Sequence, residues 1–257
     1  MIDRRLTMRC GEPGHRVAVA IRRPRGQGRL AWVGGRRDHQ RQMRTPKTDD
    51  KNIELLKLLA QLRDHIDVHR IVGLNADKLR DSKISGAFLG YLQKAAHECL
   101  AIYICKIYES STRNDQNSIP GIIESLPATP LSEEQKRKFE VFGKKYGNHV
   151  APTEAKSYLK ASFGLFRGIH SESLDRLKEF RDTIGAHSDS GATIRTLPSH
   201  AEFEAVFSFA NDFYELVSRS INDVGPATIQ RKVGPGFLKL IESLGVTGGR
   251  FDFDQET

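Results

Sequence analysis

The stretch Ser199–Ile221, SHAEFEAVFSFANDFYELVSRSI, identifies the kind of fold that this chain adopts. Ser199 precedes Glu202 by three residues, which is the spacing of a capping box at a helix N-terminus. Apolar residues then recur at intervals of three and four, as along the buried face of an amphipathic helix. They are Phe203, Val206, Phe207, Ala210, Phe213, Val217 and Ile221. The stretch therefore predicts one long helix with one buried face.

Two more long helices are predicted in the first half of the chain. The first follows the acidic cap Asp49-Asp50 and runs to about Arg70. Its apolar positions, at helical spacing, are Leu55, Leu59, Leu62 and Ile66. The second comes after a polar connection over residues 75–83, and its inward face is predicted to hold Phe88, Leu92, Ala95, Cys99, Ile102 and Tyr108.

Shorter helices and a bent one complete the pattern. Ser118 and Ser132 are predicted to cap two helices, the first with Pro120 in its opening turn. Residues 153–186 form a long helical region with an expected bend at residues 168–171, and FLKLIESLG near the C-terminus forms one more short helix.

No segment has the alternating period of a strand, so the fold class is all-α: a bundle of four to five principal helices with short accessory helices. Residues 49–224 are expected to form the helical domain. Residues 225–257 are expected to form a C-terminal tail with one short helix.

Residues 1–48 differ in composition from the rest of the chain. They contain 12 arginines and one lysine against three acidic residues, a formal charge of +10, whereas the remaining residues carry −2. This Arg/Gly-rich segment cannot bury a core, so it is expected to be a disordered arm. Three explanations stay open: an RNA- or DNA-binding arm, an organelle transit segment, or a mis-annotated leader upstream of a true start at Met43.

Composition also limits the compartment. No apolar run approaches the roughly 18 residues of a membrane span. The three cysteines, Cys10, Cys99 and Cys105, form no disulfide framework. A cytoplasmic protein that needs no membrane is expected.

The segment RDTIGAH, residues 181–187, carries the candidate chemistry. His187 can remove a proton from a ribose 2′-OH or deliver one to the leaving oxygen. Arg181 can hold the phosphate as negative charge develops. Cleavage through the neighbouring 2′-OH needs no metal ion, and no cofactor or metal site is predicted.

The spacing from Arg to His is weak support by itself. The chain has 24 arginines and 9 histidines, and three other pairs have the same range of spacing: Arg9 with His15, Arg63 with His69, and Arg195 with His200. Only Arg181 and His187 run through a predicted helix terminus, where Gly185 can loosen the last turn and redirect His187. The competing interpretation is a plain helix C-terminus, with Arg181 and His187 favoured by the helix dipole.

LKEFRDTIGAHSD, residues 177–189, resembles the signature of the HEPN superfamily. The segment AHSD and the upstream residues 100–126, LAIYICKIYESSTRNDQNSIPGIIESL, resemble the AbiU-type branch, which is named for abortive infection of phage. The resemblance covers about residues 52–224. It implies a HEPN-like bundle that forms a homodimer, with Arg181 and His187 of both subunits in one cleft and Asp182 orienting the Arg or the His.

The function implied by this resemblance is metal-independent endoribonuclease activity in phage defence or as a toxin, with RNA as substrate. The resemblance also leaves open a protein partner, either an antitoxin or a nucleotidyltransferase. The alternative is a non-catalytic HEPN module that binds nucleotide, RNA or a protein partner. His65 and His69, beside Asp64 and Asp67, have the spacing of metal ligands, but an exposed polar helix face is the preferred interpretation.

Overall fold

The computed structural model describes residues 46–80, 82, 84–109, 117–186, 198–231 and 233–246, without the side chains of residues 46, 47 and 184–186. The predicted all-α class is confirmed, because these residues form helices and no strand, apart from an isolated bridge between Pro130 and Glu154. Residues 1–45 of the predicted N-terminal arm lie outside the described residues. The first helix described, α2, begins at Pro46 and ends at Leu74.

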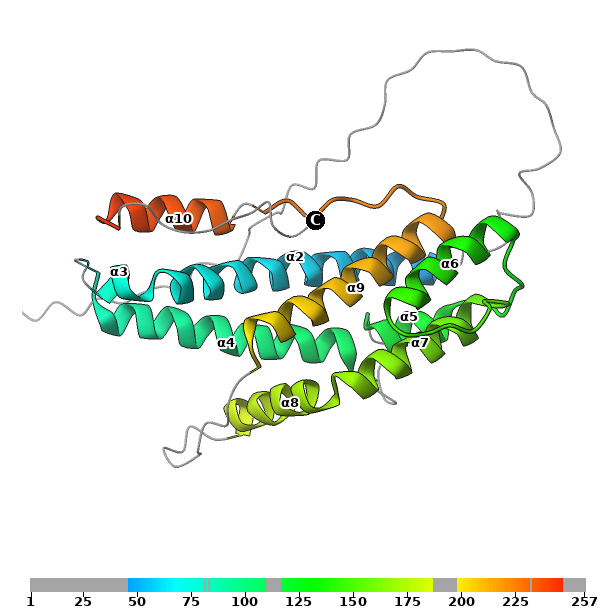
Figure 1. Ribbon diagram of the computed structural model, residues 1–257, viewed down its shortest axis with the longest axis horizontal. Helices are drawn as coiled ribbons and strands as arrows, with labels where there is room; N and C mark the ends of the chain where they lie inside the picture. The colour runs from blue at the N-terminus through cyan, green and yellow to red at the C-terminus, as the bar shows by residue number, and fades with distance from the viewer. Residues whose placement is uncertain are drawn as a thin grey trace, which may run out of the picture. The chain divides into compact units, whose positions relative to one another are not determined.

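The remaining helices follow in chain order (Figure 1). They are α3 (Ala76–Arg80), α4 (Gly86–Tyr108), α5 (Ile119–Ser125), α6 (Glu133–Lys145), α7 (Ala155–Ile169), α8 (Ser171–Ala186), α9 (His200–Ser220) and α10 (Val233–Ser243). The predicted caps at Ser118 and Ser132 are confirmed, since their side chains accept from the backbone N–H groups of Gly121 and Gln135. Within the described ranges, no helix has the length and apolar character needed to cross a bilayer.

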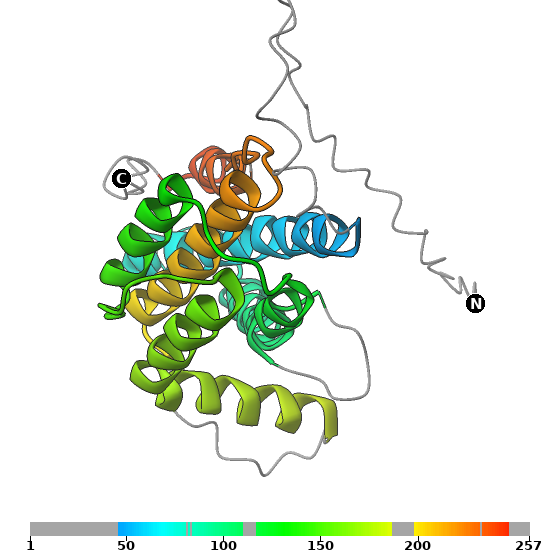
Figure 2. The same cartoon turned by 90° about the vertical axis from the view of Figure 1, so that its right-hand side faces the viewer.

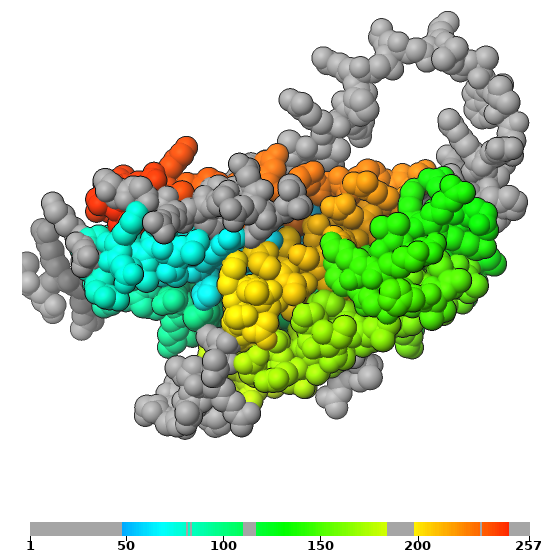
Figure 3. Space-filling view, in the orientation of Figure 1, coloured from blue at the N-terminus to red at the C-terminus, as the bar shows by residue number. Residues whose placement is uncertain are grey.

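Helix α9 lies against α2 on one side and α6 on the other (Figures 1 and 3). Its predicted capping box is present, with Ser199 accepting from the Glu202 N–H and the Glu202 side chain accepting from the Ser199 N–H. All seven predicted apolar positions are buried. The four leucine and isoleucine positions predicted on α2 are completely buried as well.

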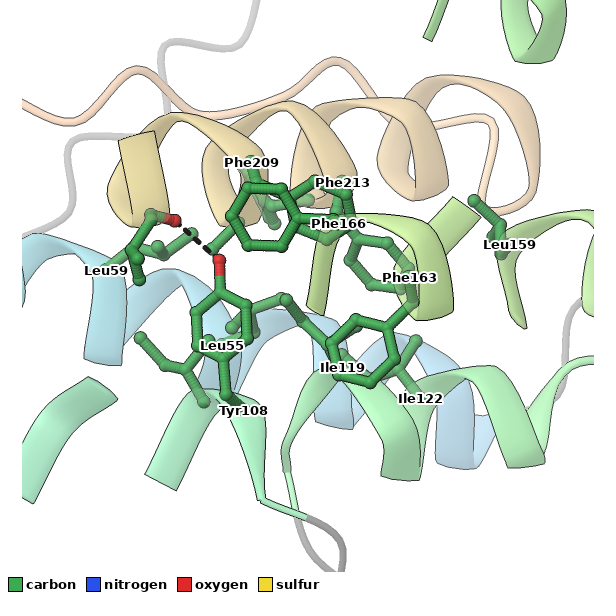
Figure 4. Close-up of a cluster of buried hydrophobic side chains, with 14 of the residues drawn as sticks. Leu55, Leu59, Tyr108, Ile119, Ile122, Leu159, Phe163, Phe166, Phe209 and Phe213 are labelled. Carbon is green, nitrogen blue, oxygen red and sulfur yellow. Dashed lines mark hydrogen bonds between the residues drawn. The ribbon is translucent and has the colours of Figure 1, made fainter. Parts of the chain in front are cut away.

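Aromatic side chains fill the centre of the helical bundle. The rings of Phe166 and Phe209 stack with their centroids 4.0 Å apart. Tyr108, at the end of α4, points into the same cluster, and its hydroxyl donates to the carbonyl oxygen of Val206 at 2.5 Å (Figure 4). This hydrogen bond satisfies the one polar atom that the tyrosine carries into the core.

The buried face of α4 differs from the predicted one. Phe88 is 51% exposed and Ile102 is 36% exposed, whereas the face that packs inward holds Ala96, Leu100, Ala101, Ile104, Cys105, Ile107 and Tyr108. The reason is that α4 is apolar around most of its circumference, so several stripes of equal spacing compete and the period alone does not select one.

The expected bend in residues 153–186 is confirmed as a break between two helices. Helix α7 ends at Ile169, His170 leaves the helical conformation, and α8 begins at Ser171. The two helices then run in different directions (Figure 2). This change of direction lets α8 pack against α4 while α7 packs against α5 and α6.

The C-terminal residues pack along α2. Arg231 donates to Oδ1 of Asp67 at 2.9 Å, and the backbone N–H of Val233 is hydrogen-bonded to Asp64. Farther along, α10 packs against α2 and the short helix α3. Helix α3 lies within residues 75–83, which were expected to form a polar connection. The apolar cluster shared by the three helices consists of Ile71, Val72, Leu79, Ile241 and Val246.

Candidate active site

Helix α8 brings Arg181 to the end of α4. Leu174 and Leu177 anchor α8 because both are buried in the main core. Arg181 follows Leu177 by four residues, so it projects from the same face one turn later. Because α8 packs on α4, the arginine reaches Glu109, the residue that directly follows α4.

The guanidinium of Arg181 is bound to two carboxylates. Its Nη1 donates to Oε2 of Glu109. Its Nε and Nη2 both donate to Oδ1 of Asp182, at 2.9 and 2.6 Å. An arginine has five N–H donors, so two of them, one on each terminal nitrogen, have no partner among the described residues.

These contacts fix the charge and the accessibility of Arg181. The hydrogen bond to Glu109 raises the pKa of the guanidinium further above its usual range, so the group stays charged at any pH of interest. The side chain remains 28% exposed. A charged, oriented and partly accessible guanidinium can bind a phosphate by donating hydrogen bonds from its two remaining N–H groups.

The nearby Cys105 thiol is not a nucleophile. The residue is buried, and burial raises the pKa of Cys105 to about 11, an effect that Arg181 opposes and that Glu109 and Asp182 reinforce. The thiol is therefore protonated at neutral pH, and a protonated thiol does not attack phosphorus or carbon.

The predicted residues Arg181 and Asp182 lie together, whereas His187 lies outside the described residues. Asp182 is 56% exposed and touches Arg181, an arrangement in which it orients the guanidinium. Helix α8 includes Gly185 and ends at Ala186, where the sequence analysis placed the end of this helical region. His187 is the next residue in the chain.

The chain matches the family model HEPN_AbiU2, described as AbiU2, over residues 47–238. It belongs to the AbiU2 family of HEPN domains. The match covers most of the chain, including α8 with Arg181 and the start of α10, and it places the protein among the HEPN modules associated with abortive infection. No curated protein and no solved structure matches the chain.

Glu109 is the residue of this AbiU2 domain that sequence reasoning missed. It lies 72 positions from Arg181 in the chain, and its neighbours in sequence, Tyr108 and Ser110, mark only the end of an apolar helix. One signal was available, because an acidic residue at a helix C-terminus opposes the helix dipole and needs a compensating cation nearby.

The other Arg–His pair in the described part of the AbiU2 domain is used for packing. Both oxygens of Glu204 accept from Arg63, at 2.8 and 2.7 Å, and the Arg63 guanidinium lies 3.9 Å from the centre of the Phe207 ring. His69 instead faces His97, with ring centroids 4.5 Å apart. Arg63 and His69 therefore do not form a joint site.

The expected exposed face around His65 and His69 is in fact covered. Both histidines are half-buried, since the ring of His65 stacks on that of Tyr103 with centroids 5.5 Å apart and the ring of His69 faces that of His97. On the other side of α2, Asp67 and Arg63 are buried against α9 and the C-terminal segment. Burial raises the pKa of Asp64 to about 6 and lowers the pKa of His69 to about 4. Across the described residues, no group of three or more potential ligands could hold a metal ion.

Proposed function

We propose that this AbiU2 domain is an endoribonuclease that cleaves RNA without a metal ion, in phage defence or as a toxin. The observation that carries the proposal is the state of Arg181: charged, held by Asp182 and Glu109, and with two N–H donors that no described residue accepts. In a HEPN domain, this arginine precedes His187 by six residues.

The reaction follows from the chemistry of these groups. A neutral His187 removes the proton of a ribose 2′-OH, and the resulting oxygen attacks the adjacent phosphorus. The bond from phosphorus to the 5′-oxygen breaks, and a second, protonated His187 gives its proton to that oxygen. The products are a 2′,3′-cyclic phosphate and a 5′-OH, and Arg181 stabilises the negative charge of the transition state.

This scheme needs two histidines, which supports a homodimer with one shared cleft. The RNA would bind across the two-fold axis, with Arg181 of each subunit on the phosphate. We place the activity in the cytoplasm, with an antitoxin or a nucleotidyltransferase as the protein that restrains or modifies it.

RNA cleavage by the purified full chain in the presence of EDTA tests the proposal. We expect cleavage of single-stranded RNA to products with cyclic phosphate ends. His187→Ala should lower the rate about 100-fold or more, since general acid–base groups contribute that much. His149 is an exposed loop residue between α6 and α7. The His149→Ala variant is therefore the matched control and should leave the rate unchanged.

Two results would contradict this assignment. A parent protein that binds RNA but does not cut it would favour the non-catalytic HEPN module. A His187→Ala variant that cuts as fast as the parent would remove the histidine from the mechanism.

A further inference from the structure

Glu109 occupies a position where a carboxylate is unfavourable for the helix that it ends. It is the C-cap of α4, and its backbone N–H donates to the Cys105 carbonyl oxygen at 2.9 Å. The negative end of the helix dipole points at this residue, and an acidic side chain there is unfavourable. The stability of α4 therefore does not explain the choice of glutamate.

The ion pair with Arg181 also uses only part of the carboxylate. Oε2 of Glu109 accepts from Arg181, while Oε1 is buried and has no partner among the described residues. The Arg63–Glu204 pair of the same protein is different, because both oxygens of Glu204 are hydrogen-bonded to one arginine. A pair kept only for stability would be expected to resemble the second arrangement.

Glu109 and Asp182 approach the guanidinium from different elements. Asp182 is the neighbour of Arg181 on α8 and moves with it, whereas Glu109 is fixed at the end of α4. Of the two partners described here, Glu109 is therefore the one that can hold the guanidinium in place relative to the rest of the bundle. Its removal would leave the Arg181 side chain free to change rotamer together with Asp182.

We propose that Glu109 is a positioning residue for RNA cleavage, which fixes the guanidinium of Arg181 so that its two remaining donors meet the scissile phosphate. The proposal rests on the endoribonuclease function given above. Glu109 does not touch the RNA in this scheme. It acts through Arg181, and a misplacement of about 1 Å in such a group lowers the rate about 100-fold.

The kinetic constants separate positioning from a purely structural role. Loss of orientation weakens the binding of the transition state more than the binding of the substrate, so kcat should fall. Loss of one negative charge beside the phosphate should leave KM unchanged or lower it. A structural ion pair predicts a lower melting temperature with kcat and KM both unchanged at temperatures where the protein is folded.

The experiment compares Glu109→Gln with a control on the same helix. Arg176 of α8 pairs with Glu202 of α9 at 2.9 Å, with side-chain exposures of 25% and 29%. The corresponding values for Arg181 and Glu109 are 28% and 32%. We expect Glu109→Gln in the full chain to lower kcat about 10- to 100-fold without raising KM, and Glu109→Ala to lower it further. Glu202→Gln should keep the parent kcat.

The outcomes distinguish this inference from the function on which it rests. If the parent cleaves RNA and Arg181→Ala does not, an unchanged kcat in Glu109→Gln overturns the role of Glu109 alone. Equal losses of kcat in Glu109→Gln and Glu202→Gln, in step with their melting temperatures, also overturn it. A parent that cuts no RNA overturns both proposals together.

Discussion

Gly234, at the start of α10, lies directly against the side chain of Asp67. A Cβ atom at this glycine would lie 2.8 Å from Oδ2 and 2.9 Å from Cβ of Asp67. Asp67 cannot move aside easily, because it is completely buried and bound to Arg231. Glycine is needed here for close approach between α10 and α2.

We therefore expect Gly234→Ala to lower the free energy of unfolding by about 1–3 kcal/mol, as other overpacked sites do. Gly236→Ala is the matched control, since a Cβ there meets nothing within 4 Å. It should be neutral or stabilise α10 by up to about 1 kcal/mol through helix propensity. Urea unfolding of both variants measures the difference, and equal stabilities would contradict the close contact.

The residues of the candidate site show what sequence can identify at this scale. Arg181 and Asp182 were predicted, because they are adjacent in the chain and belong to a family-like segment. Glu109 was not, because its relation to Arg181 exists only when α4 and α8 pack together. Asp67 was assigned to an exposed face, because the residues that cover it come from α9 and from the C-terminal segment.

Among the helices, α9 and α4 mark the two limits of prediction. The cap of α9 and seven of its buried positions were predicted correctly, since apolar residues recur there at helical spacing, but Phe209, Tyr214 and Leu216 are buried as well. Helix α4 was predicted at the right place, but the prediction of its buried face was wrong. The reason is that apolar residues occur around most of the helix, so their spacing does not indicate which side is buried.

Three histidines lie at the junction of helices α2, α4 and α9: His69, His97 and His200. Burial, followed by the proximity of His97 and His200, lowers the pKa of His69 to about 4. The unfolded chain takes up a proton at this position near pH 6.5, whereas the folded protein does so only near pH 4. Between these values, His69 makes the folded state less stable as the pH falls.

His69→Gln removes this titration. The unfolding free energy of the variant, relative to the parent, should therefore rise by about 1–2 kcal/mol as the pH is lowered from 7 to 4.5, after allowance for solvent screening. Asp64 acts in the opposite direction in both proteins, because its pKa is raised to about 6, so only their difference isolates His69. A difference that stays constant with pH would contradict a neutral, buried His69.

At the scale of the whole molecule, the proposed dimer makes the active site a property of two chains. In that arrangement, Arg181 of one subunit serves the same cleft as His187 of the other. An inactive chain should then inactivate the dimer that it shares with a parent chain.

We expect an equal mixture of parent and His187→Ala chains, unfolded and refolded together, to retain roughly a quarter of the cleavage rate of the parent at the same total chain concentration. Half of the randomly assembled dimers would be mixed and would lack one of the two histidines, so only the quarter that are parent homodimers would cleave RNA. The two proteins refolded separately and then combined are the control and should give half of the parent rate. Retention of half of the rate by the co-refolded mixture would exclude a cleft that needs both histidines.

The link between Arg231 and Asp67 also orders events during synthesis of the chain. The two residues are 164 positions apart, and the Arg63–Glu204 pair on the same face of α2 spans 141. The buried carboxylate of α2 has to wait for an arginine that is translated 164 residues later. The bundle can close over this face of α2 only after the segment with Arg231 has emerged, so until then the face stays exposed to solvent or bound by chaperones.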